Sequence, residues 1–173
     1  LAIYGLWTGG WSTVLFPVAG FVLVPLVELF LVGRGTKTND LMVQHRTVHD
    51  VVLLTGFSMN WAGWVLLIHR LSQPDIGVWD AVGMILCAGI LFGALGINIA
   101  HELGHRREKL FQRMAKALLL LSMYMHFFIE HNRGHHRRMA TPEDPATARR
   151  GEVVYAFLFR SVFFGWLSAW ELE

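Results

Sequence analysis

Residues 81–105 read AVGMILCAGILFGALGINIA followed by HELGH, and this stretch decides the fold of the chain. Its first twenty residues carry no formal charge and run directly into His101, Glu102 and His105. About 20 apolar residues suffice for a helix to cross the hydrocarbon core of a bilayer. The stretch therefore predicts a membrane-spanning helix that ends in a histidine-rich motif.

The composition also indicates a membrane protein. Hydrophobic residues make up 54% of the 173 residues and charged residues only 16%, with a mean hydropathy of +0.42. Soluble domains carry about 25% charged residues. Two further apolar stretches, residues 11–32 and 51–68, are long enough to cross a bilayer, and Pro17 and Pro25 are expected to kink the first. We expect an all-α fold, a polytopic membrane helical bundle with about three complete transmembrane helices and cytoplasmic histidine-box helices.

We interpret residues 1–173 as one part of a longer integral-membrane domain, because residues 1–7 resemble the tail of an earlier span. Within it we expect transmembrane helices in residues 1–100 and a histidine-box region at the cytoplasmic face in residues 101–150. Residues 151–173 are expected to form an interfacial amphipathic helix, because a charge at Arg160 in its middle disfavours a span. The single cysteine, Cys87, excludes a disulfide framework and predicts a small buried apolar side chain.

Positive charge is concentrated around the histidines. Residues 101–150 carry ten Lys and Arg against five Asp and Glu, whereas the rest of the chain carries five against eight. The positive-inside rule then places the basic loop at residues 33–47 and the end of the third span in the cytoplasm. An alternative interpretation is a docking surface for an acidic protein partner. The cytoplasmic face of the membrane is the expected location of the histidines.

The first histidine box is His101-Glu102-Leu103-Gly104-His105. On a helix, His101 and His105 share one face and can bind one metal ion. Glu102 points away from them and is a candidate catalytic residue that orients a ligand or handles protons. This pattern alone also fits a zinc metalloprotease.

The second histidine box is His131-Asn132-Arg133-Gly134-His135-His136. On an α-helix His131 and His135 would share a face, and His136 would lie about 100° around the axis, toward a second ion. Five imidazoles exceed the three protein ligands that are typical of catalytic zinc, and they suit iron. His126 is expected off the ligand face, with an outer-shell hydrogen bond as its candidate role.

The apolar run between the boxes, residues 117–129, has only thirteen uncharged residues. A straight helix across residues 113–130 would be roughly 27 Å long at 1.5 Å per residue. If such a helix crossed the bilayer, the two boxes would lie on opposite sides of the membrane. Ligands of one metal ion must instead lie within about 2.0–2.3 Å of that ion. We therefore expect this run to stay along the cytoplasmic face. Residues 141–150 are expected to form a turn in which Pro142 and Pro145 stop helix formation.

Three segments resemble the membrane-bound alkane 1-monooxygenases, which belong to the wider fatty-acid desaturase and hydroxylase superfamily. They are Asn98–His105, His126–His136 and Ala140–Ala148. The resemblance implies six membrane helices in the whole protein and two non-haem irons. It implies His101, His105, His131, His135 and His136 as metal ligands, with further ligands on elements that these 173 residues do not contain.

The implied activity is hydroxylation of the terminal methyl group of n-alkanes to primary alcohols, with O2 and electrons from rubredoxin. The implied partners are therefore rubredoxin, an n-alkane, O2 and the lipid bilayer, and no nucleic acid. Arg137 and Arg138 follow the second box and are candidates to dock an acidic rubredoxin.

Three alternatives remain open at this point. One is a related di-iron hydroxylase or desaturase that acts on lipid or alkyl-aromatic substrates. Another is an intramembrane zinc metalloprotease that uses the first box. The third is a membrane protein that binds metal or haem without catalysis.

Overall fold

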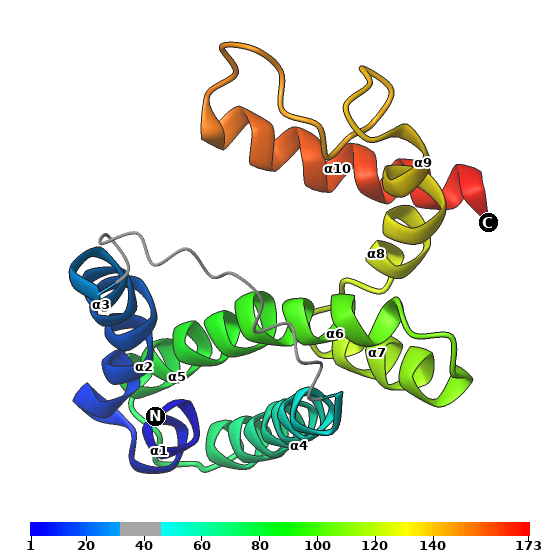
Figure 1. The fold of residues 1–173 in the computed structure, drawn as a ribbon. Coiled ribbons are helices and arrows are strands. Elements are labelled where there is room, and N and C mark those ends of the chain that lie inside the picture. The colour runs from blue at the N-terminus through cyan, green and yellow to red at the C-terminus, as the bar shows by residue number, and fades with distance from the viewer. Residues whose placement is uncertain (32–45) are drawn as a thin grey trace. The chain divides into compact units, whose positions relative to one another are not determined.

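A computed structural model describes residues 1–31 and 46–173, so the expected basic loop at residues 33–47 lies almost entirely outside the described residues. Every regular element in the described part is a helix, which confirms the all-α class (Figure 1). The chain forms two compact units, Leu1–Ile99 and Ala100–Glu173.

The helical segments of the first unit are α1 (Ala2–Thr8), η1 (Gly10–Val14), α2 (Leu15–Val18), η2 (Ala19–Leu23), α3 (Val24–Leu31), α4 (Arg46–Leu71), α5 (Val78–Ile90), η3 (Leu91–Gly96) and α6 (Ile97–Gly104), of which α6 continues into the second unit. Three continuous helices built from these segments are long and apolar enough to cross a membrane: Gly10–Leu31, Thr47–Leu71 and Val78–Gly104. They contain the three spans that the sequence predicts, apart from Val32, which lies outside the described residues. The third ends within the first histidine box, at Gly104.

The first candidate span is irregular, as its two prolines predict. It begins as a 3₁₀ turn, and a π-helical turn, η2, interrupts it just before Pro25. Proline has no N–H to donate to the carbonyl four residues earlier, here that of Phe21, and this loosens the regular ladder. A turn precedes this span, because Gly9 and Gly10 adopt φ values of 73° and 57° that favour glycine.

The third candidate span forms the core of the first unit. Met84, Cys87 and Leu91 are buried there, which agrees with the apolar role expected of the cysteine. Its glycines differ in their surroundings. A Cβ added at Gly83 would lie 2.7 Å from the Thr13 hydroxyl oxygen, whereas one added at Gly89 would meet nothing within 4 Å. Gly83 therefore permits close helix packing and Gly89 does not contribute to it.

The helical segments of the second unit that follow α6 are α7 (Lys109–Leu121), α8 (His126–Ile129), η4 (Glu130–His135), α9 (His136–Arg138) and α10 (Val154–Leu172). The run between the boxes is not among the candidate spans and does not form one helix. It breaks at Met123, which has a left-handed φ of 54°. The backbone N–H groups of Met123 and Tyr124 donate to carbonyls of the last turn of α7.

Helix α10 is not among the candidate spans either. Its central Arg160 is paired with Glu152, with distances of 2.6 and 2.7 Å from guanidinium nitrogens to the two carboxylate oxygens. Bidentate pairing satisfies a charge that would be costly in the middle of a bilayer. An interfacial position of α10 remains a prediction.

We expect Gly83→Val to destabilise the protein by about 1–3 kcal/mol, the usual effect of overpacking a tight contact. The buried, β-branched Thr13 has little freedom to move away. Gly89→Val, in the same helix, is the matched control and should leave stability unchanged. Thermal unfolding in detergent measures both, and equal midpoints for the two variants would contradict close packing at Gly83.

Candidate metal centre

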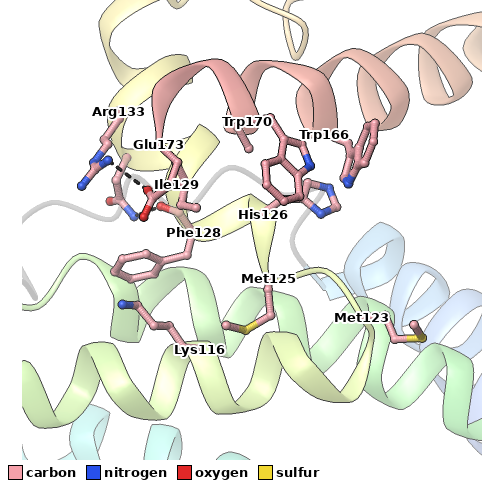
Figure 2. A pocket seen from close by; sticks show the side chains of 12 residues that line it. Lys116, Met123, Met125, His126, Phe128, Ile129, Arg133, Trp166, Trp170 and Glu173 are labelled. Carbon is pink, nitrogen blue, oxygen red and sulfur yellow. Dashed lines mark hydrogen bonds and ion pairs between the residues drawn. The ribbon is translucent and has the colours of Figure 1, made fainter.

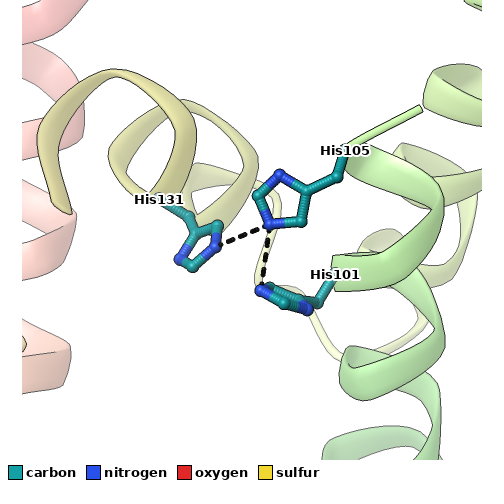
Figure 3. Close-up of side chains that lie close together, drawn as sticks. All are labelled: His101, His105 and His131. Atoms are coloured by element: carbon teal, nitrogen blue, oxygen red, sulfur yellow. Dashed lines mark hydrogen bonds between the residues drawn. The ribbon is translucent and has the colours of Figure 1, made fainter. Parts of the chain in front are cut away.

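Three imidazoles from the two boxes point toward one another (Figure 3). His101 and His105 lie at the end of the third candidate span, and His131 comes from η4. The Nε2 atoms of His101 and His105 are 3.0 Å apart, and those of His105 and His131 are 3.2 Å apart. In the part of the chain that the structure describes, residues 1–31 and 46–173, these three histidines form a group of metal-binding side chains. Their ligand atoms lie close enough together to hold one metal ion.

These separations fit ligands of a common ion. Metal–imidazole bonds of about 2.0–2.1 Å place neighbouring ligand nitrogens about 3 Å apart. The same nitrogen, Nε2, faces the centre in all three residues. The donor set is therefore suitable for a transition metal, and imidazole suits iron among several others.

The second box is wound as a π-helix, and this corrects the pairing expected from an α-helix. In η4, hydrogen bonds run from residue i to i+5, so residues five apart come onto one face. His131 and His136 consequently lie together, with their Nε2 atoms 3.0 Å apart. His136 thus joins the trio through His131, in place of the His135 that α-helical geometry predicts.

His135 is turned toward a different partner. Its Nδ1 is 2.9 Å from Oδ2 of Asp144, and its ring stacks beside that of His131 with centroids 5.3 Å apart. An ionised carboxylate can only accept a hydrogen bond, so Nδ1 of His135 is the donor in this contact and Nε2 is the nitrogen left for a metal ion. His135 is therefore prepared to bind metal through Nε2, although that atom is not part of the trio.

Glu130 holds the π-helical turn from inside. Its carboxylate accepts hydrogen bonds from the backbone N–H of His135 at 3.1 Å, from Arg138 at 2.9 Å and from Ser168 of α10 at 2.9 Å. Only 6% of its surface is exposed. A buried carboxylate with three donors restrains the backbone of the box strongly.

Sequence reasoning named neither Glu130 nor Asp144 as a site residue. Both are charged residues within the motifs that carried the family resemblance, directly before the second box and in the following Thr-Pro-Glu-Asp-Pro turn. Their positions gave a signal, but only the fold shows that they are buried against the histidines.

Two of the three imidazoles, those of His105 and His131, are in surroundings that disfavour the protonated form. Burial lowers the pKa of His131 to about 3, and the neighbouring histidines add to this effect. Burial and the neighbouring histidines also lower the pKa of His105. Neutral imidazoles are the form that binds metal.

Glu102 lies behind the first box. Its Oε1 is 3.5 Å from Nδ1 of His101, and about half of its side chain is exposed. The carboxylate thus faces the side of the ring away from the converging Nε2 atoms. This position suits orientation of a ligand better than contact with a reacting group.

The two arginines after the second box differ in their surroundings. Arg137 is exposed, as a docking residue must be. Arg138 is half-buried and its guanidinium donates to Glu130 and Ser168. Arg138 is therefore part of the support of the box, and the expectation that both arginines are free to dock a partner is wrong for it.

Two cavities adjoin this region of the second unit. A small cavity of about 90 Å³ borders His126, His131 and His135. A larger one of about 580 Å³ is lined mostly by apolar side chains, including Met125, Phe128, Trp166 and Trp170, and by none of the five box histidines (Figure 2). His126 borders both cavities, and its buried Nε2 has no hydrogen-bond partner within the described part of the chain.

Comparison with known proteins gives consistent matches. A family model described as fatty acid desaturase matches residues 77–173. Alkane 1-monooxygenase 1 of Alcanivorax borkumensis is 36% identical over 169 residues, which cover 95% of this chain and 42% of that protein. An alkane 1-monooxygenase of Ectopseudomonas oleovorans is 49% identical over 112 residues, covering 65% of this chain and 26% of that protein.

A further match is the hydroxylase component of a xylene/toluene monooxygenase of Pseudomonas putida, 36% identical over 89 residues. These residues cover 51% of this chain and 23% of that protein. The chain thus spans less than half the length of each of these relatives.

We expect Glu130→Gln to destabilise the protein by about 1–3 kcal/mol. The NH2 group of the glutamine would face the three groups that donate hydrogen bonds to the Glu130 carboxylate, so at least one of these bonds would be lost. The exposed Glu171 of α10 supplies the control, since Glu171→Gln removes the same charge at the surface. Thermal unfolding of both variants in detergent measures the difference. Indistinguishable midpoints would show that Glu130 does not hold the turn.

Proposed function

The chain belongs to the fatty acid desaturase family, and on this basis we propose that it is part of a non-haem di-iron monooxygenase that hydroxylates n-alkanes. The observation that carries the proposal is the convergence of the Nε2 atoms of His101, His105 and His131. The reaction inserts one oxygen atom of O2 into a terminal carbon–hydrogen bond. Two electrons from rubredoxin and two protons convert the other oxygen atom to water.

We propose that five imidazoles hold the metal: His101, His105, His131, His135 and His136. Two iron ions bound here, with ligands added from elements outside these residues, would supply the redox chemistry that activates O2. The trio at the end of the third candidate span suits one ion. His136 adjoins the trio through His131, and His135 extends the donor set away from it, which supports a second ion.

The residues around the ligands orient the donor set. Asp144 accepts the Nδ1 proton of His135, and Glu130 fixes the backbone turn that presents the second box. Glu102 lies behind His101 and is assigned an orienting role. None of these carboxylates lies among the converging nitrogens, so the centre is rich in nitrogen and has little negative charge.

The proposed location is the cytoplasmic side of the bacterial inner membrane. Three apolar helices support insertion in a bilayer, and the basic segment from residue 101 to 150 supports a cytoplasmic position of the boxes. An alkane partitions into lipid, so it would approach along the third candidate span, which carries His101 in its last turn. Electrons would arrive from water.

The geometry favours this proposal over a zinc protease. A protease of the His-Glu-x-x-His type needs its glutamate beside the open position of the metal. Glu102 faces Nδ1 of His101 on the opposite side of the ring. A related hydroxylase or desaturase of lipid or alkyl-aromatic substrates is the second candidate, favoured by the match to a xylene/toluene monooxygenase component.

We expect the full-length protein, purified from the membrane fraction, to contain two irons per chain. With O2 and reduced rubredoxin it should convert an n-alkane to the primary alcohol, as gas chromatography measures. His135→Ala should abolish both stable iron binding and alcohol formation, whereas His69→Ala, in the last turn of α4 and outside both boxes, should retain both.

One bound zinc with peptidase activity would overturn the proposed function. Hydroxylation of an alkyl-aromatic methyl group without alkane oxidation would favour the second candidate. Unchanged iron content in His135→Ala would remove that residue from the ligand set.

Docking of the electron donor gives a separate prediction. Arg137→Glu should raise the apparent KM for reduced rubredoxin and weaken the salt dependence, with kcat at saturating donor unchanged. Arg138→Glu should instead lower thermal stability, because it places a carboxylate against buried Glu130. Steady-state kinetics and thermal unfolding of both variants measure this contrast. An unaltered KM in Arg137→Glu would contradict a docking role, and the charge of Arg137 would then serve only the orientation of the protein in the membrane.

A further inference from the structure

We propose that the loop between α9 and α10, residues 139–153, is a positioning device for the metal ligand His135. Asp144 is its positioning residue and Arg160 is the clamp that fixes the loop to α10. The inference rests on the proposed metal centre and adds two residues that act on it without touching the metal.

The contact between Asp144 and His135 is buried and directional. Asp144 is 1% exposed, and its Oδ2 is 2.9 Å from Nδ1 of His135. The carboxylate selects the tautomer with hydrogen on Nδ1 and fixes the ring plane. Carboxylate partners of this kind orient ligand imidazoles and raise their basicity.

The carboxylate is itself immobilised. Its Oδ2 accepts a hydrogen bond from the Thr147 hydroxyl at 2.5 Å, and its Oδ1 accepts one from the backbone N–H of Ala146 at 2.9 Å. Both oxygens are therefore committed, and rotation of the side chain would break bonds inside the loop. By contrast, Glu102 lies 3.5 Å from the first-box ligand His101 and is half-exposed.

Arg160 holds the loop from the other side. Its guanidinium donates to the carbonyls of Pro145 and Thr147 at 3.0 and 2.9 Å, and both residues follow Asp144 closely in sequence. The same guanidinium binds both oxygens of Glu152, which lowers the pKa of that carboxyl group to about 2. A planar fork with several donors can meet four acceptors at once, and a lysine cannot reproduce this.

The test uses the full-length protein in detergent, freed of iron and titrated with cobalt(II) against a competing chelator. We expect Asp144→Ala to weaken cobalt affinity about 10–100-fold, the usual effect of removing an outer partner of a metal ligand. Glu143→Gln removes an exposed charge from the neighbouring position and should leave the affinity unchanged. Arg160→Lys should weaken affinity without removing any ligand or the loop carboxylate.

X-ray absorption of the cobalt-loaded protein provides a second readout that general loosening of the loop would not change. Asp144→Ala should lower the average number of bound imidazoles. Thr141→Val, which removes a different loop hydrogen bond, from the Thr141 hydroxyl to the carbonyl of Arg138, should not. Equal affinities for Asp144→Ala and Glu143→Gln would overturn this inference while the metal centre stands. A wild-type protein that binds no cobalt and no iron would overturn the proposed function itself.

Discussion

Ligands of one metal centre must lie within a few ångströms of one another, and the rest of this structure depends on that constraint. The Nε2 atoms of His105 and His131 are 3.2 Å apart although 26 residues separate them in the chain. One straight helix over this distance would carry the second box roughly 39 Å away at 1.5 Å per residue. Two breaks prevent this: the non-helical residues 105–108 between α6 and α7, and the left-handed turn at Met123 after α7. The second box thereby comes back beside the first.

A second requirement is that clustered imidazoles stay neutral and fixed in orientation. Burial and mutual repulsion of charged forms favour the neutral rings of His105 and His131. The buried carboxylate of Asp144 determines which ring nitrogen of His135 is free, and buried Glu130 fixes the backbone N–H of the same residue. Both depend on α10, through Ser168 and Arg160, so this helix supports the site that it does not enter.

The π-helical turn has a consequence for how such motifs are interpreted. Spacing of four residues indicates a shared face only while the helix stays α-helical. In the wider π-helical turn at Glu130–His135, the residue that meets His131 is His136 and not His135. It also frees His135 to turn toward the loop, where Asp144 fixes it. The local winding of the backbone thus divides the donor set between two directions.

Three features were predicted from the sequence alone: the three apolar helices, the five box histidines as metal ligands, and an intervening run that does not cross the membrane. Those features follow from hydropathy, from spacing and from the reach of a metal–ligand bond, all of which are local or geometric. Only the tertiary structure decided the π-helical winding, the burial of Glu130 and Asp144, and the structural role of Arg138. Each of these depends on contacts with α10 or its preceding loop, because a charged residue is stable in a buried position only where distant parts of the chain supply its hydrogen bonds.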